Sequence, residues 1–411
     1  MVRRIAGLTL ALLIVAGCGS ARLGPPTSSS AADGSPAAKA DAVMRIVRDL
    51  MTQAHLRAAI VRVTVAGKEV VTQAAGDSMT SVPATTTMHF RNGAVAISYV
   101  STLLLKLVDE QKVSLEDKLS KWLPDFPHAD RVNLGQLARM TSGYPDYVIG
   151  NDAFSNESYA NPFRHWTTQD ILAQISSRPL LYEPGTNWNY AHTNYVLLGL
   201  ALEKATGQDM PSLLQSKVLG PLGLTATANS ETPDIPSPVL HAYSSERREF
   251  LKIPAGVPFY EESTFWDPSW TITHGAIQTT TIYDMEATAV GIGSGRLLTA
   301  DSYKKMVSTE LRGKTRTQPD CPTCFEQSDG YTYGLGIVIS GKWLMQNPLF
   351  SGEAAVEAYL PSEKVAIAVA VTYAPEAFDS QGNYTNQADI LFRKIAAEVV
   401  PHEAPPMPPG R

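Results

Sequence analysis

A serine hydroxyl attacks a carbonyl only when a neighbouring base takes its proton, because the hydroxyl is a weak nucleophile at neutral pH. A lysine three residues after the serine can act as that base, since both side chains then lie on one face of a helix. Ser302 and Lys305 have this spacing. The segment around them is polar, so we interpret the pair as part of a solvated surface helix.

Two other catalytic patterns are missing from the sequence. It contains no Gly-x-Ser-x-Gly, the turn that presents the serine of α/β-hydrolases. It also contains no His-x-x-x-His pair that could hold a metal on one face of a helix. We therefore expect neither a metal nor a cofactor.

Cys321 and Cys324 are two of the three cysteines and form Cys-Pro-Thr-Cys in a polar stretch. In an oxidising compartment this spacing favours a local disulfide that pins a loop. A zinc site would need two further ligands, and a redox motif would need a thioredoxin-like context. Neither accompanies the pair, and free thiols are the remaining alternative.

The N-terminus has the features of an export signal. Arg3 and Arg4 precede an apolar run at 5–16 that is too short to span a membrane. The Val-Ala-Gly before Cys18 resembles a bacterial lipobox, in which cleavage leaves the cysteine to be diacylated. We expect a signal peptide at 1–17 and a lipid on Cys18, anchoring the protein on the extracytoplasmic side of the cell membrane. An ordinary secretory signal is the alternative.

The composition is that of a globular protein: of 411 residues, 44% are hydrophobic and 18% are charged. The net charge of −6 and the lack of a basic run argue against nucleic acid as a partner. Residues 18–40 are rich in Ser, Ala, Pro and Gly, which predicts a flexible tether. Residues 401–411 are rich in proline and predict a disordered tail. We expect the remaining residues, 41–400, to form one folded domain, and we expect the tethered protein to be a monomer.

Hydrophobic periodicity predicts strands near both ends of this domain and helices between them. The expected strands are 59–65, 69–72, 333–340, 354–360 and 364–372. The expected helices begin at 41 and cover 95–109, 134–140, 194–206 and 383–400. This order predicts an α/β fold in which the first and last strands pair in one sheet, with a mostly helical region between them.

Several segments resemble the family of serine β-lactamases, D-alanyl-D-alanine carboxypeptidases and penicillin-binding proteins, especially its class C-like esterase branch. They lie in the family's order over about 41–400, at Phe90–Ser98, Leu103–Asp117, Trp122–Phe126, Leu134–Gly143, Pro184–Tyr190, Asn194–Gly199, Gly275–Thr280 and Tyr333–Gly336. The resemblance implies a β-lactamase/transpeptidase-like fold, with an antiparallel sheet from both chain ends, flanked by helices, and a mostly helical subdomain.

The resemblance also implies that the catalytic groups are lost. The family's first motif is Ser-x-x-Lys, and here Ala94 and Ile97 stand at its serine and lysine. Ser98, one turn deeper, has no lysine beside it, so we expect it to pack in the helix. Without the resemblance, the segment from Ala94 is simply the buried start of a helix.

The two remaining family motifs are each partly retained. The Tyr-x-Asn motif keeps Tyr190 but has His192 at the asparagine, where we expect a packed or hydrogen-bonded imidazole. The third motif has Phe350 in place of its cationic or imidazole group, followed by Ser351 and Gly352. Together the substitutions predict that acyl transfer is lost.

Three functions remain open. The first is a non-catalytic envelope lipoprotein that binds a peptidoglycan peptide or an envelope protein. The second is an esterase- or peptidase-like hydrolase using Ser98 or a water activated by His192. The third is a structural protein whose cleft is filled by Ile97 and Phe350. An open cavity lined by Tyr190, His192 and Ser351 would favour the first over the third.

Overall fold

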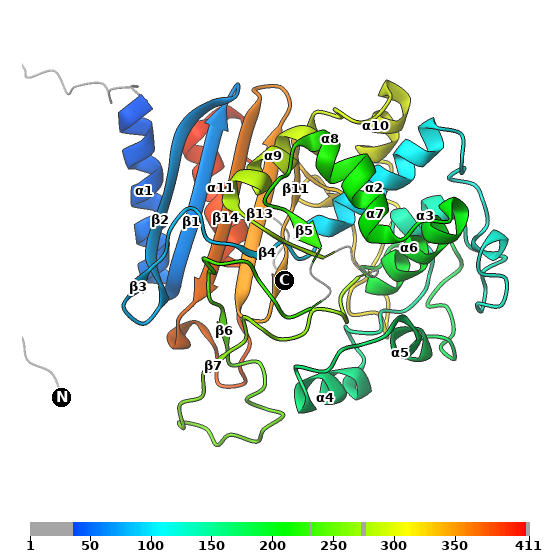
Figure 1. Cartoon of the computed structure of the whole chain (residues 1–411), viewed down its shortest axis with the longest axis horizontal. Helices are drawn as coiled ribbons and strands as arrows, with labels where there is room; N and C mark the ends of the chain where they lie inside the picture. The colour runs from blue at the N-terminus through cyan, green and yellow to red at the C-terminus, as the bar shows by residue number, and fades with distance from the viewer. Residues whose placement is uncertain (1–35, 230–231, 273–276, 408–411) are drawn as a thin grey trace, which may run out of the picture.

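The computed structural model describes residues 36–229, 232–272 and 277–407. Cys18 and the expected signal peptide lie outside these residues. Figure 1 shows a sheet on one side of the molecule and a mostly helical part on the other. The helices are α1 (Pro36–Gln53), α2 (Val95–Asp109), α3 (Leu134–Ala138), α4 (Asp152–Ala160), α5 (Thr168–Ala173), α6 (His192–Thr206), α7 (Met210–Leu214), α8 (Gly220–Leu222), α9 (Ile282–Gly293), α10 (Ala300–Met306) and α11 (Gln387–Val399).

The main sheet is antiparallel and has the order β3-β2-β1-β14-β13-β11-β10-β9, with β12 also paired to β13. The first strand therefore pairs with the last, as the sequence predicted. Its strands are β1 (Leu56–Val65), β2 (Lys68–Met79), β3 (Val82–Pro83), β9 (Thr332–Tyr333), β10 (Val338–Ser340), β11 (Trp343–Gln346), β12 (Leu349–Phe350), β13 (Glu353–Leu360) and β14 (Val365–Tyr373).

Two small sheets complete the strand pairing. The first joins β4 (Phe90–Arg91), β8 (Gln278–Thr280) and β5 (Ala228–Asn229), and the second joins β6 (Tyr243–Ser244) and β7 (Glu261–Glu262). Because β4 ends just before α2, its pairing with β8 fixes the direction in which that helix begins.

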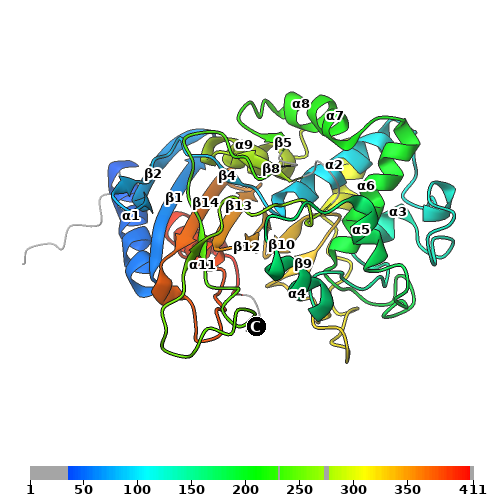
Figure 2. The same ribbon diagram turned by 60° about the horizontal axis from the view of Figure 1, so that its bottom comes forward.

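Helices cover both faces of the main sheet. α1 and α11 contact each other and one face, whereas α9 packs on β1, β13 and β14 from the other side (Figures 1 and 2). Burial on both faces explains why every residue of β14, which is apolar without interruption from Val365 to Val371, is buried.

α2 is the central helix of the helical part. Twelve of its residues are buried, and it contacts α6, α7 and α10. A helix that is apolar around most of its circumference is stable only when neighbours surround it. The start of α2 is therefore held by packing, which fixes the position of Ala94 at its N-terminus.

The structure corrects both predicted ends of the folded domain. Residues 36–40, assigned to the tether, form the first turns of α1, because an alanine-rich stretch favours a helix. The tail prediction is wrong for 401–407. There the carbonyl of Glu403 accepts a hydrogen bond from Trp343 Nε1 at 2.7 Å, and the carbonyl of Pro406 accepts one from Arg393. Buried donors need such partners, and this keeps the segment packed.

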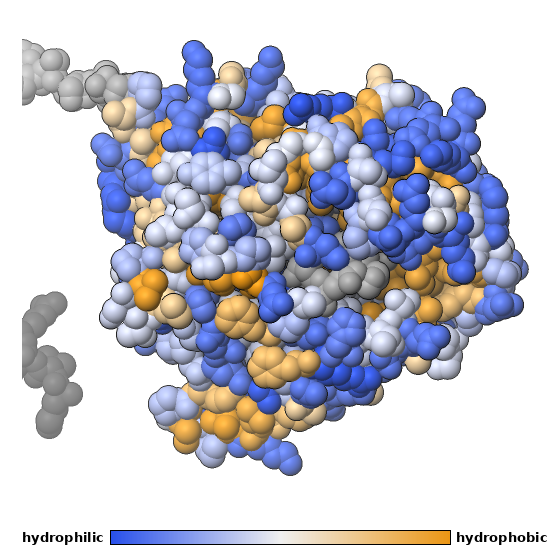
Figure 3. Space-filling view, in the orientation of Figure 1, coloured by the Kyte–Doolittle hydropathy of each residue, from blue (hydrophilic) through white to orange (hydrophobic). Residues whose placement is uncertain are grey.

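The surface carries an apolar patch on the long loop between β6 and β7. Leu251 and Val257 are exposed there, and Figure 3 shows apolar side chains gathered at this lower end of the molecule. Within the described residues, no helix combines the length and apolar character needed to cross a bilayer.

Candidate active site

A cavity of about 630 Å³ opens beside the start of α2. It lies within the size range of small-molecule sites. Its lining includes Ala94, Tyr190, His192, Phe350 and Ser351, so the structure brings all three sequence motifs to one place. Ile97 is not among the lining residues, and neither it nor Phe350 fills the cavity. For the residues that the structure describes, the alternative of a cleft filled by Ile97 and Phe350 is therefore wrong.

Gly93 allows β12 to approach the start of α2 closely. Its φ of +51° lies in the left-handed region, and a Cβ atom there would be 2.6 Å from Pro348 Cβ and 2.7 Å from Phe350 Cε1. The Phe350 ring therefore packs beside the backbone that presents Ala94. The Ala94 side chain offers no hydroxyl to the cavity.

Ile97 and Ser98 belong to the core. Ile97 has no exposed surface, and Ser98 is fully buried with its Oγ donating to the Val95 carbonyl at 2.7 Å. Ser98 does not line the cavity, so it is not placed to act as a substitute nucleophile. Ser302 is also engaged elsewhere, since its Oγ donates to Asp109 Oδ1 at 2.6 Å.

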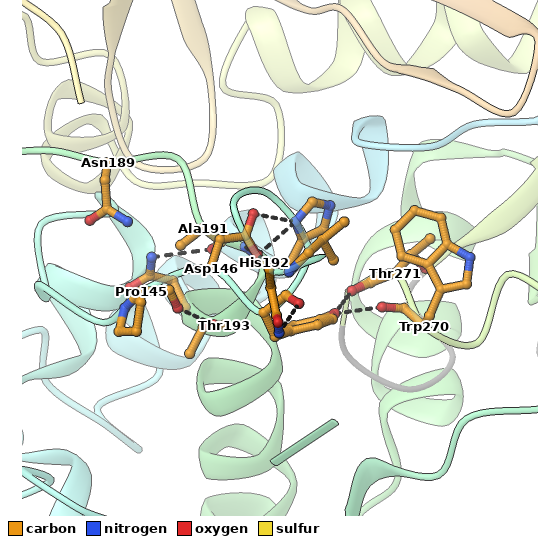
Figure 4. Close-up of polar contacts among 12 residues, drawn as sticks. Pro145, Asp146, Asn189, Ala191, His192, Thr193, Trp270 and Thr271 are labelled. Atoms are coloured by element: carbon orange, nitrogen blue, oxygen red, sulfur yellow. Dashed lines mark hydrogen bonds and ion pairs between the residues drawn. The ribbon is translucent and has the colours of Figure 1, made fainter. Parts of the chain in front are cut away.

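His192 is held by a carboxylate that the sequence reasoning missed. Its Nδ1 lies 3.0 Å from Asp146 Oδ2, and its backbone N–H donates to Asp146 Oδ1 at 3.3 Å (Figure 4). Asp146 is almost fully buried. It follows the Met-Thr-Ser-Gly segment, but nothing in the sequence pairs it with a residue 46 positions later.

Aromatic rings surround this pair. The His192 ring lies 5.3 Å from that of Tyr190 and 6.0 Å from that of Trp270, measured between centroids. Burial and the nearby charge of Asp146 raise the pKa of Tyr190. The phenol is therefore neutral at physiological pH and could donate a hydrogen bond, but it is not a phenolate base.

The third motif forms a tight turn after β12. Ser351 has a φ of +50° and Gly352 one of +79°, and a Cβ on Gly352 would be 1.9 Å from the Tyr243 carbonyl oxygen. Only glycine fits there. The Gly352 N–H donates to Tyr384 Oη at 2.8 Å, which fixes the turn at the cavity wall.

Glu246 is a second carboxylate that the sequence reasoning missed, and unlike Asp146 it lines the cavity. Burial raises the pKa of its carboxyl group, while hydrogen bonds from Tyr384, Ser244 and the Ser351 backbone oppose that rise. These donors also fix the direction of the carboxylate. No spacing in the sequence connects Glu246 with the third motif, about a hundred residues later.

Cys321 and Cys324 are joined in a disulfide. The residues between them, Pro322 and Thr323, line the cavity, so the disulfide shapes one wall. Phe325 follows and packs against Trp188 with ring centroids 4.8 Å apart. In the part of the chain that the structure describes, no group of three His, Cys, Asp or Glu side chains could hold a metal ion.

This geometry has the framework of a serine acyl-transfer site, and the family model named Beta-lactamase matches residues 43–392. The chain belongs to the beta-lactamase family. Penicillin-binding protein 4* of Bacillus subtilis is 29% identical over 149 residues, which cover 35% of this chain and 31% of that protein. Protein flp of Staphylococcus aureus strain N315 is 25% identical over 195 residues, which cover 46% of this chain and 38% of that protein. The chain thus spans about a third of the length of these curated relatives.

Solved structures confirm the β-lactamase/transpeptidase-like fold. D-amino acid amidase from Ochrobactrum anthropi SV3, complexed with D-phenylalanine, superposes with a TM-score of 0.71 at 20% identity, covering 88% of this chain and 99% of the amidase. A penicillin-binding protein from Bacillus halodurans superposes with a TM-score of 0.66 at 17% identity, covering 86% of this chain and 99% of that protein. At such low identity these matches show only that the fold is shared.

Proposed function

We propose that this member of the beta-lactamase family is a non-catalytic lipoprotein of the cell envelope that binds a ligand in its inherited cleft. One observation carries the proposal: an open cavity of about 630 Å³ is lined by Ala94, where the family's nucleophilic serine would stand. The ligand is a peptidoglycan peptide or a segment of an envelope protein.

The loss of chemistry follows from two side chains. Ala94 has no hydroxyl to attack a carbonyl, and Ile97 has no amine to take a proton. In a serine protease, removing the nucleophile alone lowers the rate by roughly a million-fold. The Ser98 hydroxyl donates to the Val95 carbonyl within its own helix, so it does not restore the reaction.

The lipid anchor is part of the same proposal. Cys18 would attach the protein to the membrane, and the residues between it and α1 would set its reach. Metabolic labelling with a clickable palmitate analogue should label the wild-type protein but not the Cys18→Ala variant. Equal labelling of both would contradict the anchor.

A hydrolase is the second candidate, and the His192–Asp146 pair favours it. A carboxylate that holds Nδ1 leaves Nε2 of the imidazole as a base, which could activate a water molecule. This candidate predicts ester hydrolysis without a covalent intermediate. We place it second because only this pair supports it, whereas the substitutions at Ala94, Ile97 and Phe350 all remove groups that the family's reaction uses.

The test combines three measurements on the purified protein. We expect no covalent labelling by a fluorescent penicillin, no turnover of p-nitrophenyl acetate above background, and saturable binding of soluble peptidoglycan fragments by calorimetry. Labelling or turnover in the wild type would contradict the non-catalytic assignment. Turnover that disappears in His192→Ala would establish the second candidate instead.

A further inference from the structure

Aromatic side chains form a large part of the cavity walls. One cluster contains Trp188, Phe325 and Tyr331, with ring centroids 4.8–6.3 Å apart. A second cluster joins Phe154 to Trp270 at 6.1 Å. The faces of such rings carry partial negative charge and attract cations as well as apolar groups.

The charged groups of the cavity are acidic or paired. Glu246 lines it, and His192, which also lines it, is paired with Asp146. Among the described lining residues there is no lysine or arginine. Phe350 stands where the resemblance places a cationic or imidazole group for a substrate carboxylate. The described walls therefore offer a negative ligand little attraction.

Glu246 is positioned as the anchor for a positive group. Burial raises the pKa of its carboxyl group, while Tyr384, Ser244 and the Ser351 backbone donate hydrogen bonds that oppose this rise and fix the direction of the carboxylate. Ammonium groups bind favourably over aromatic faces, and a carboxylate that lines the same cavity adds an opposite charge. A bound cation would stabilise the charged carboxylate, which burial by itself disfavours.

We propose that the cavity selects ligands that combine an apolar or aromatic body with a protonated amine, the amine contacting Glu246. This inference rests on the proposed binding function and specifies its ligand class. The rim supports the apolar part, because Ile149 and Leu349 line the cavity and remain 40% and 38% exposed. An apolar group leaving the mouth would cover these side chains.

Three probes of similar size test the charge preference: phenethylammonium, 2-phenylethanol and 3-phenylpropionate. Three of the six tryptophans, Trp188, Trp266 and Trp270, line the cavity, so intrinsic fluorescence reports binding directly. We expect affinity to decrease from the ammonium to the alcohol to the carboxylate. The Glu246→Gln variant should bind the ammonium about tenfold more weakly, the size of one lost charge-assisted contact, and bind the alcohol unchanged.

Glu249→Gln is the matched control, since Glu249 lies on the same loop, is exposed and does not line the cavity. This variant should bind all three probes like the wild type. Tighter binding of the carboxylate than of the ammonium would overturn the amine inference while leaving ligand binding intact. An equal loss of ammonium affinity in both variants would also overturn it. If none of the probes and none of the peptidoglycan fragments bound, the proposed function itself would fail.

Discussion

Restoring the serine and the lysine together should recover covalent acylation. Ile97 follows Ala94 by one turn, and its N–H donates to the Ala94 carbonyl at 3.0 Å. Side chains in helices point toward the preceding turn, so a lysine at 97 would extend toward position 94 and the cavity. The Ala94→Ser/Ile97→Lys variant therefore places the hydroxyl and the amine as the reaction requires.

The burial of Ile97 sets the smallest stability cost of the variant, to which any desolvation of the lysine amine adds. This side chain is fully buried, so replacing it forfeits about 2–3 kcal/mol of apolar burial. A domain of this kind is stable by about 5–15 kcal/mol, and the variant should remain folded with a lower Tm. A positioned proton acceptor contributes about 10²–10⁴-fold to a rate, which is the expected gain over Ala94→Ser alone.

The assay is labelling by a fluorescent penicillin, with mass spectrometry to locate the acyl group on residue 94. Ala94→Ser/Ile97→Met is the matched control, because methionine has a similar reach and no proton to exchange. Equal labelling of the lysine and methionine variants would refute the role assigned to position 97. A folded lysine variant that stays unlabelled would refute the claim that the cleft retains the geometry for acylation.

Three further predictions concern stability. Deleting residues 401–411 leaves Trp343 Nε1 without its acceptor and should cost about 1–3 kcal/mol, measured by urea unfolding of the shortened protein. Replacing Cys321 and Cys324 by serine removes a short crosslink and should lower the free energy of unfolding by about 2 kcal/mol. Peptide affinity should also decrease, because the cavity wall loosens. An unchanged free energy of unfolding would contradict this prediction. Burial raises the pKa of Glu353 to about 8, so the free energy of unfolding should fall as pH rises from about 4.5 to about 8, and Glu353→Gln should flatten that slope.

The helices and strands were predicted well from the sequence, because hydrophobic periodicity is a property of neighbouring residues in the chain. The helix expected at 95–109 is α2 with the same bounds, and the strands expected at 354–360 and 364–372 are β13 and β14 within one residue at each end. The run expected as one strand at 333–340 is instead β9 and β10, because Gly336 adopts a φ of +68° between them.

The site was predicted only where the resemblance supplied motifs. Ala94, Tyr190, His192 and Ser351 line one cavity as their motifs require. Asp146 and Glu246 could not be found in this way, because each meets its partners through contacts between loops. Asp146 lies on the loop after α3 and Glu246 on the loop after β6. Such contacts leave no periodic trace in the sequence.

The substitutions divide the inherited site into a part that was lost and a part that was kept. The lost groups, at Ala94 and Ile97, would act only in the reaction itself, where the serine attacks the carbonyl and the lysine takes the serine's proton. The groups that shape the cavity are held by interactions that the family's acyl transfer does not need, and the substituted His192 is held in the same way, by its bond to Asp146 at 3.0 Å. A buried carboxylate without that partner would be costly, so His192 also stabilises the fold. For this reason the proposed binding does not depend on acyl transfer, and the charge of the cavity walls, rather than the family's reaction, should decide which ligands bind.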